Sequence, residues 1–169
     1  IPSAVCGRVE RFEDVDFFKI TGKAGQRIGC RIYAQSVTEG IHGMVVRGPL
    51  SYLMDSLLTL YAPNGQLVAQ NDNFLGGDAF LDFTFPEDGD YSLEVRDARF
   101  AGSGRYVYCV EVFDRPHVHA VFPLAVQKDK TEDAIAIGLV DDDTKVKLAG
   151  DADLGWTQRR FDVANQPTN

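Results

Sequence analysis

Residues 55–85, DSLLTLYAPNGQLVAQNDNFLGGDAFLDFTF, decide the fold of this chain. Two short runs of β-prone residues, 57–62 and 66–71, are separated by Pro63-Asn64-Gly65. Pro, Asn and Gly between apolar runs are typical of a tight hairpin turn. The stretch therefore predicts two antiparallel strands that lie side by side.

The register of this hairpin predicts an acidic cluster at one end of the sheet. A turn centred between Asn64 and Gly65 puts Leu60 opposite Ala69 and Leu58 opposite Asn71. Oxygen-bearing side chains then gather where the strands end, and carboxylate and amide oxygens are ligands that calcium prefers. The predicted calcium ligands are Asp55, Asn71, Asp72, Asn73, Asp78 and Asp82. A solvated acidic rim paired with arginine remains the alternative.

Short alternating strands recur along the rest of the chain, with Gly, Pro and Asp between them. Such spacing is typical of an all-β fold, here an antiparallel β-sandwich. We expect one unit over residues 1–114 and a β-rich extension or partial second β domain over residues 115–169. The predicted core of the first unit comprises Phe18, Ile20, Ile28, Ile32, Leu58, Leu60, Leu81, Phe83, Leu93, Val95, Tyr108 and Val110.

Composition excludes several classes of function. The net charge of −8 and the pI of about 4.8 disfavour a nucleic-acid-binding protein, which needs basic residues for the phosphate backbone. No apolar run reaches the ~20 residues needed to cross a bilayer, so membrane insertion is not expected. The first residues show no signal-peptide pattern and no initiating methionine, and we interpret the sequence as a piece of a longer protein.

The three cysteines can be sorted by strand alternation. Cys30 shares its side of the strand with the apolar residues Ile28 and Ile32 and is therefore expected in the core. The same alternation puts Cys109 and Cys6 on outer faces. A Cys6–Cys109 disulfide forms if the first and last strands of the unit are neighbours. Three free thiols are the alternative.

Catalytic motifs are missing from the sequence, and we expect no enzyme activity. Any nucleophile–histidine pair would need His42, His117 or His119. We interpret His117 and His119 as solvent-facing residues at a domain junction, since a third metal ligand is not evident. Pairs of aspartates in turns, such as 14–16 and 88–90, are expected to bond backbone amides.

Several motifs occur together and in order: DVDFF at 14–18, AGQRI at 24–28, DSLLTLYAPNGQLVAQND at 55–72, FPEDGDYSLEV at 85–95 and GRYVYCVEV at 104–112. As a set they resemble the bacterial pre-peptidase C-terminal (PPC) domain. The resemblance implies a jelly-roll-like β-sandwich of a secreted or cell-surface bacterial protein. Residues from Pro116 resemble the start of an immunoglobulin-like domain.

The family resemblance implies a non-catalytic accessory or binding module that serves substrate targeting, adhesion or interdomain scaffolding. Its expected partners are a protein or polysaccharide ligand and the adjacent domains of a longer chain. One alternative is a polysaccharide-binding module, and another is part of a secreted peptidase that is removed on maturation. The polysaccharide reading needs a row of exposed rings, for which the candidates are Tyr33, Tyr52, Phe74, Phe100 and Trp156.

Overall fold

The computed structural model describes residues 2–37, 54–74, 76–150, 162–163 and 166–167. It is built almost wholly from antiparallel strands and separates into two compact units, Ile1–Asp114 and Arg115–Asn169. Each unit has its own buried apolar cluster. Segment 38–53, which includes His42 and Tyr52, lies outside the described residues, as does Trp156.

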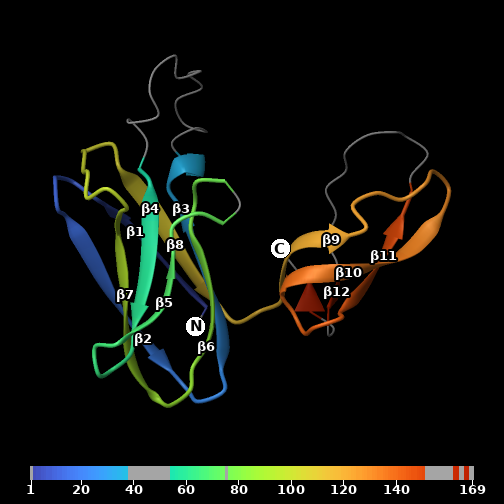
Figure 1. Cartoon of the computed structure of the whole chain (residues 1–169), viewed down its shortest axis with the longest axis horizontal. Helices are drawn as coiled ribbons and strands as arrows, with labels where there is room; N and C mark the ends of the chain where they lie inside the picture. Colours follow the sequence, from blue (N-terminus) through green and yellow to red (C-terminus); the bar gives the residue numbers. More distant parts are fainter. Residues whose placement is uncertain (1, 38–53, 75, 151–161, 164–165, 168–169) are drawn as a thin grey trace. The chain divides into compact units, whose positions relative to one another are not determined.

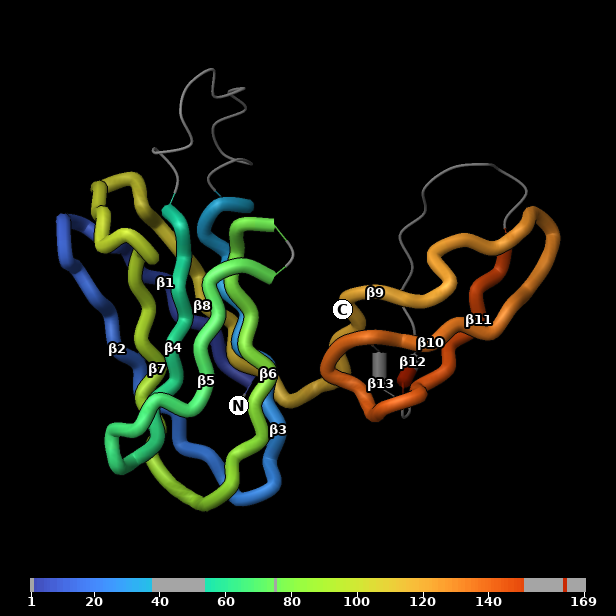
Figure 2. The backbone as a smooth tube through the Cα atoms, in the orientation of Figure 1, coloured from blue at the N-terminus to red at the C-terminus, as the bar shows by residue number. Residues whose placement is uncertain are grey.

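Eight strands form the first unit: β1 (Ser3–Arg8), β2 (Val15–Gly22), β3 (Arg27–Tyr33), β4 (Ser56–Tyr61), β5 (Leu67–Asn71), β6 (Phe80–Thr84), β7 (Gly89–Asp97) and β8 (Val107–Phe113). One sheet, sheet A, has the order β1-β8-β3-β6, and the other, sheet B, has the order β2-β7-β4-β5 (Figures 1 and 2). Two four-stranded antiparallel sheets connected in this order make a jelly roll. The predicted fold class is confirmed.

The hairpin that decides the fold has the predicted register over most of its length. Leu58 lies opposite Asn71 and Leu60 opposite Ala69. The register shifts at Tyr61, which lies opposite Leu67, because the turn adds one residue on the β5 side. Gly65 in that turn has a φ of 83°, a backbone conformation that glycine adopts without a Cβ clash.

The predicted core residues fill the space between the sheets. Ten of the twelve are buried, and Phe18 and Phe83 are partly buried and pack against the same cluster. Residues at alternate strand positions point outward, so the period-two pattern of the sequence becomes the two faces of each sheet. At about 25 cal/mol for each Å² of apolar surface removed from water, this layer is the main source of stability.

Tyr108 lies in the core but keeps its hydroxyl paired. The hydroxyl donates a hydrogen bond to Asp16 at the edge of the layer. A Cβ atom on Gly7 would stand 2.4 Å from the Tyr108 hydroxyl oxygen, so the glycine makes room for the ring. Burial, and then the bond to Asp16, raise the pKa of Tyr108 above its ordinary value.

The second unit is a small sheet of β11 (Lys145–Ala149), β10 (Thr131–Leu139) and β9 (His117–Phe122), with a separate two-stranded pair of β12 (Asp162–Val163) and β13 (Gln166–Pro167). Its core consists of aliphatic side chains, including Ala134, Val146 and Leu148. The immunoglobulin-like identity of this unit stays a prediction.

The interpretation of His117 as solvent-facing is wrong. Its side chain is buried, with 4% of the residue exposed. His117 lies opposite Leu139 across the β9–β10 pair, and a bulge between Ile137 and Gly138 sets this pairing. Because Leu139 is also buried, both residues lie on a covered face, and the sequence did not reveal the bulge. The His119 ring packs edge-on against that of His117.

Candidate functional site

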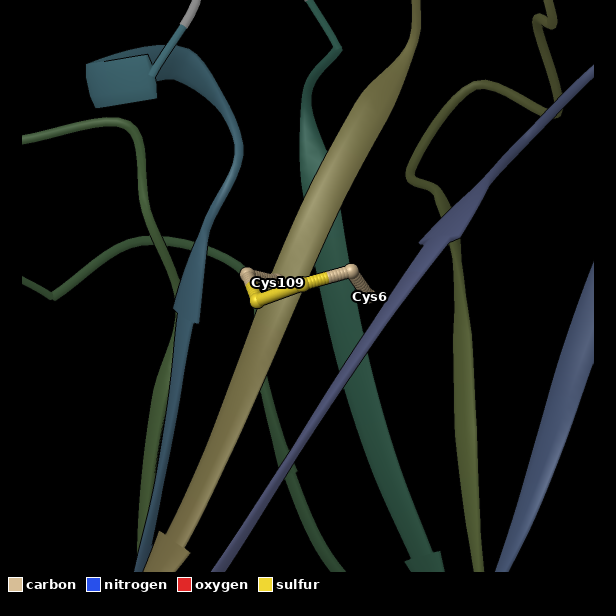
Figure 3. The surroundings of a disulfide bond; sticks show 2 residues. All are labelled: Cys6 and Cys109. Atoms are coloured by element: carbon tan, nitrogen blue, oxygen red, sulfur yellow. A yellow bond between two sulfur atoms is a disulfide. The ribbon is translucent and has the colours of Figure 1, made fainter.

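A disulfide joins the first and last strands of the first unit. Cys6 on β1 lies directly opposite Cys109 on β8, and their sulfur atoms are bonded across the pair (Figure 3). Cys30 is a free thiol buried in the core. The expected faces of all three cysteines are confirmed, and so is the bridge that the sequence left open.

The acidic end of the sandwich is where β4 begins, with the β7–β8 loop on one side of it and the β5–β6 loop on the other (Figure 1). A residue that the sequence analysis missed organises it. The carboxylate of Asp97, which is fully buried, accepts hydrogen bonds from the backbone N–H groups of Asp55, Arg99 and Ala101 at 2.9 to 3.1 Å. Asp97 therefore fastens the β7–β8 loop to the start of β4.

Asp78 makes a second attachment of the same kind. Its carboxylate accepts hydrogen bonds from the backbone N–H groups of Ala34, Gln35 and Ser36, at 2.8 to 3.2 Å, and from the Ser36 hydroxyl. Charge-assisted bonds of this kind satisfy backbone donors that would otherwise be left open at the end of a strand. Asp78 thus joins the β5–β6 loop to the chain that follows β3.

The other predicted calcium ligands have different partners. The Asn71 side chain accepts a hydrogen bond from the Phe80 N–H and donates one to the Asn73 carbonyl, so it closes the β5–β6 loop. Asp82 makes a bidentate pair with Arg27 on the outer face of sheet A. Asp55 lies 3.8 Å from the Arg99 Nε atom. Asp72 and Asn73 are exposed.

The arginine contacts of Asp55 and Asp82 fit the alternative that the sequence left open, a solvated acidic rim paired with arginine. The backbone amides that bind Asp78 were not part of that alternative. Among the described residues, no three histidine, cysteine, aspartate or glutamate side chains lie together in a way that would hold a metal ion. The prediction for the turn aspartates is confirmed for Asp14, which accepts from the Glu10 N–H, and for Asp88, which accepts from the Ala24 N–H. It is wrong for Asp16 and Asp90, whose carboxylates bond side chains instead. The calcium site itself stays a prediction.

Calcium binding has a direct test in thermal unfolding. If Asp55 and Asp72 bind the ion, excess calcium raises the melting temperature and Asp72→Ala removes the rise, because a ligand stabilises the state that binds it. The matched control is Asp90→Ala, which removes an exposed carboxylate outside the predicted ligand set that is paired with Lys19. Identical melting curves in calcium and in chelator would establish the arginine-paired rim.

A polar network covers the outer face of sheet B, and the sequence analysis missed it as well. The Glu94 carboxylate accepts hydrogen bonds from the Tyr61 hydroxyl and from the Arg96 Nε, each at 2.9 Å. The Arg96 guanidinium also lies 4.0 Å from the centre of the Phe100 ring. The bond to Glu94 is the main cause of the raised pKa of Tyr61. The only sign of this network in the sequence is that Glu94 and Arg96 are polar and occupy alternate, outward-facing positions of β7.

The candidate aromatic residues do not form one row within the described part of the chain. The Phe74 ring packs against Phe80 on the outer side of sheet A, whereas Phe100 lies under Arg96 on sheet B. Tyr33, on the outer face of sheet A, is covered by the Arg31 guanidinium at 4.7 Å, and its hydroxyl donates to Glu111.

Comparisons with known proteins agree on the first unit. Residues 14–97 match the family model of the bacterial pre-peptidase C-terminal domain. A stretch of 82 residues, 48% of this chain, is 38% identical to a probable subtilase-type serine protease of Deinococcus radiodurans. It covers 10% of that protein, so the chain spans only a small part of the relative's length.

Two solved structures are similar to part of this chain. The pre-peptidase C-terminal domain of a collagenase from Bacillus anthracis is 12% identical, with 67% of this chain and 90% of that chain covered and a TM-score of 0.46. PliG of Aeromonas hydrophila, a periplasmic inhibitor of g-type lysozyme, is 17% identical, with 66% and 85% covered and a TM-score of 0.42. Similarity at this level adds nothing about function.

The matched residues run from just before β2 to the end of β7. Strands β1 and β8, which the disulfide joins, complete sheet A outside that range. None of the helices within the described residues is long and apolar enough to span a membrane. Through residues 14–97 this chain belongs to the bacterial pre-peptidase C-terminal domain family, whose members are non-catalytic accessory domains found in secreted proteases.

Proposed function

We propose that the first unit is an accessory binding module of a secreted or cell-surface bacterial protein, and that it holds the parent protein near a protein substrate. The observation that carries the proposal is the family match over residues 14–97, together with the similarity to part of a subtilase-type protease. A peptidase domain that acts on insoluble material gains local substrate concentration from such a module.

The contacts of the first unit fit an accessory role outside the cell. The polar groups of the acidic end hold loops together, and the carboxylate of the buried Asp97 accepts three hydrogen bonds from backbone N–H groups. The Cys6–Cys109 bond lies on an outer face, and disulfides of this kind persist in oxidising compartments. Both features suit a rigid module that is exposed to an extracellular environment.

Sedimentation with insoluble polymers tests this proposal. The whole 169-residue chain is mixed with insoluble collagen, cross-linked casein, chitin or cellulose, and the pellet is analysed after centrifugation. We expect the chain to pellet with one or both protein polymers and to hydrolyse neither. Binding to chitin or cellulose alone would establish the polysaccharide alternative, and an empty pellet in every case would contradict a targeting role.

A further inference from the structure

The first unit exposes an unusual concentration of phenylalanine at one corner. Phe12 is 69% exposed, Phe17 is 58% exposed and Phe100 is 41% exposed. Phe12 lies in the β1–β2 loop, Phe17 on the outer face of β2, and Phe100 in the β7–β8 loop, which is the neighbouring loop in space (Figure 1). We call these three residues the phenylalanine patch. Exposed apolar groups that gather in one place mark interaction sites more often than scattered ones do.

Register and hydrogen bonds connect the members of the patch. The Glu13 N–H donates to the Phe100 carbonyl at 2.9 Å, which puts the residue after Phe12 directly against Phe100. Val15 lies opposite Arg96 in the β2–β7 pair, so Phe17 is the diagonal neighbour of Arg96. Phe17 lies directly opposite Glu94, and Glu94 is paired with Arg96, whose guanidinium covers the Phe100 ring.

The two loops that carry the patch are held rigidly. The Ser103 N–H donates to the Val9 carbonyl, and Asp97 accepts from two N–H groups of the β7–β8 loop. A Cβ atom on Gly102 would stand 1.9 Å from the Arg11 carbonyl oxygen, which shows how closely the loops pack. A surface that is ordered before binding loses less conformational entropy when a partner docks.

Backbone strain is concentrated at the same place. Glu13 has a φ of 63° and Phe100 a φ of 57°. A left-handed backbone conformation is unfavourable for a non-glycine residue, and such residues collect at functional sites. Here two of them face each other across one hydrogen bond, and both are in the loops that present the patch.

The charges around the patch indicate the chemistry of a partner. The β1–β2 loop carries Glu10, Glu13 and Asp14 against the single cation Arg11. The two other cations beside the patch are already paired, Arg96 with Glu94 and Arg99 with Asp97. The excess of carboxylates in the β1–β2 loop, beside the apolar rings, complements a segment that is both apolar and basic.

We propose that the phenylalanine patch docks an extended polypeptide segment in which leucine-sized apolar residues alternate with lysine or arginine. The inference rests on the proposed accessory function and adds to it a surface and a partner class. The apolar side chains contact the three rings, and the basic side chains meet the acidic β1–β2 loop. This assigns the β1–β2 and β7–β8 loops, rather than the β5–β6 loop with Asp78, to recognition.

A labelled peptide of about twelve residues, alternating lysine and leucine, tests the proposal by fluorescence anisotropy with the whole chain at physiological salt. We expect Phe17→Ser to weaken binding about tenfold, since buried aromatic anchors dominate interface energies. The matched control is Leu67→Ser, at a residue of similar exposure, 48%, near the opposite turn of sheet B. This control should leave the affinity unchanged. Amide chemical shifts of the unmutated chain report whether Phe12, Phe17 and Phe100 respond to the peptide.

Three outcomes would overturn the proposal: a lysine–serine peptide that binds equally well, a Leu67→Ser variant that weakens binding as much as Phe17→Ser does, or no binding of the lysine–leucine peptide. If the peptide fails to bind while the chain still pellets with insoluble protein, the patch is not the docking site and the accessory function stands. An empty pellet contradicts the accessory function by itself.

Discussion

Replacing both Cys6 and Cys109 with serine lowers the free energy of unfolding of the first unit by about 4 kcal/mol. The bond closes a loop between residues separated by 103 positions, and a loop of this length restricts the unfolded chain strongly. It also fastens β1, an edge strand that pairs only with β8 in sheet A. Since single domains are stable by about 5–15 kcal/mol, the loss is a large share of the total.

Urea unfolding followed by circular dichroism measures this effect, and reduction of the unmutated chain should reproduce it. The double serine variant serves as the control, because a reducing agent should not change it further. Burial raises the pKa of the Cys30 thiol to about 12, so Cys30 stays protonated and does not exchange with the bond. A loss below about 1 kcal/mol would show that the hydrogen bonds of β1 alone hold the strand.

Asp97→Ala should destabilise the first unit by about 3 kcal/mol. The substitution leaves three backbone N–H donors without their carboxylate acceptor at a site that is closed to water, and each such donor costs about 1–3 kcal/mol before relaxation. It also frees the β7–β8 loop, so hydrogen exchange at Arg99 and Ala101 should become faster.

The matched control for this prediction is Asp82→Ala. Asp82 also makes short bonds to a cation, but its side chain is 35% exposed and that of Arg27 is 39% exposed. A pair accessible to water contributes at most about 1 kcal/mol. If the two variants have the same stability, the backbone bonds of Asp97 do not support the acidic end, and its assignment as a structural attachment is wrong.

Strand faces and the central register could be predicted from the sequence because both follow from local rules. Alternation placed Cys30 inside and Cys6 and Cys109 outside, and the Pro-Asn-Gly turn set Leu58 opposite Asn71. The bulge at Tyr61 was missed, since one extra residue near a turn leaves the apolar pattern of the hairpin unchanged.

The acidic residues were harder to interpret because their partners are distant in the sequence. Asp78 binds backbone amides more than forty positions away, and Asp82 pairs with Arg27 across two neighbouring strands. The residues next to an aspartate in the sequence do not show whether its carboxylate fastens a loop, as that of Asp97 does, or is solvated. Composition therefore predicts a cluster of aspartates, and only the fold shows which donors each one meets.

Fusion of this chain to a peptidase domain tests most directly the central claim, that the first unit is an accessory binding module. A subtilase-type catalytic domain is produced with and without this chain fused to it, and both forms are assayed on insoluble cross-linked casein and on a short soluble peptide. An accessory binding module should raise the rate on the insoluble protein severalfold, by increasing local concentration, and leave kcat/KM for the soluble peptide unchanged. Equal rates on both substrates with and without the chain, or peptide hydrolysis by the chain alone, would contradict the account.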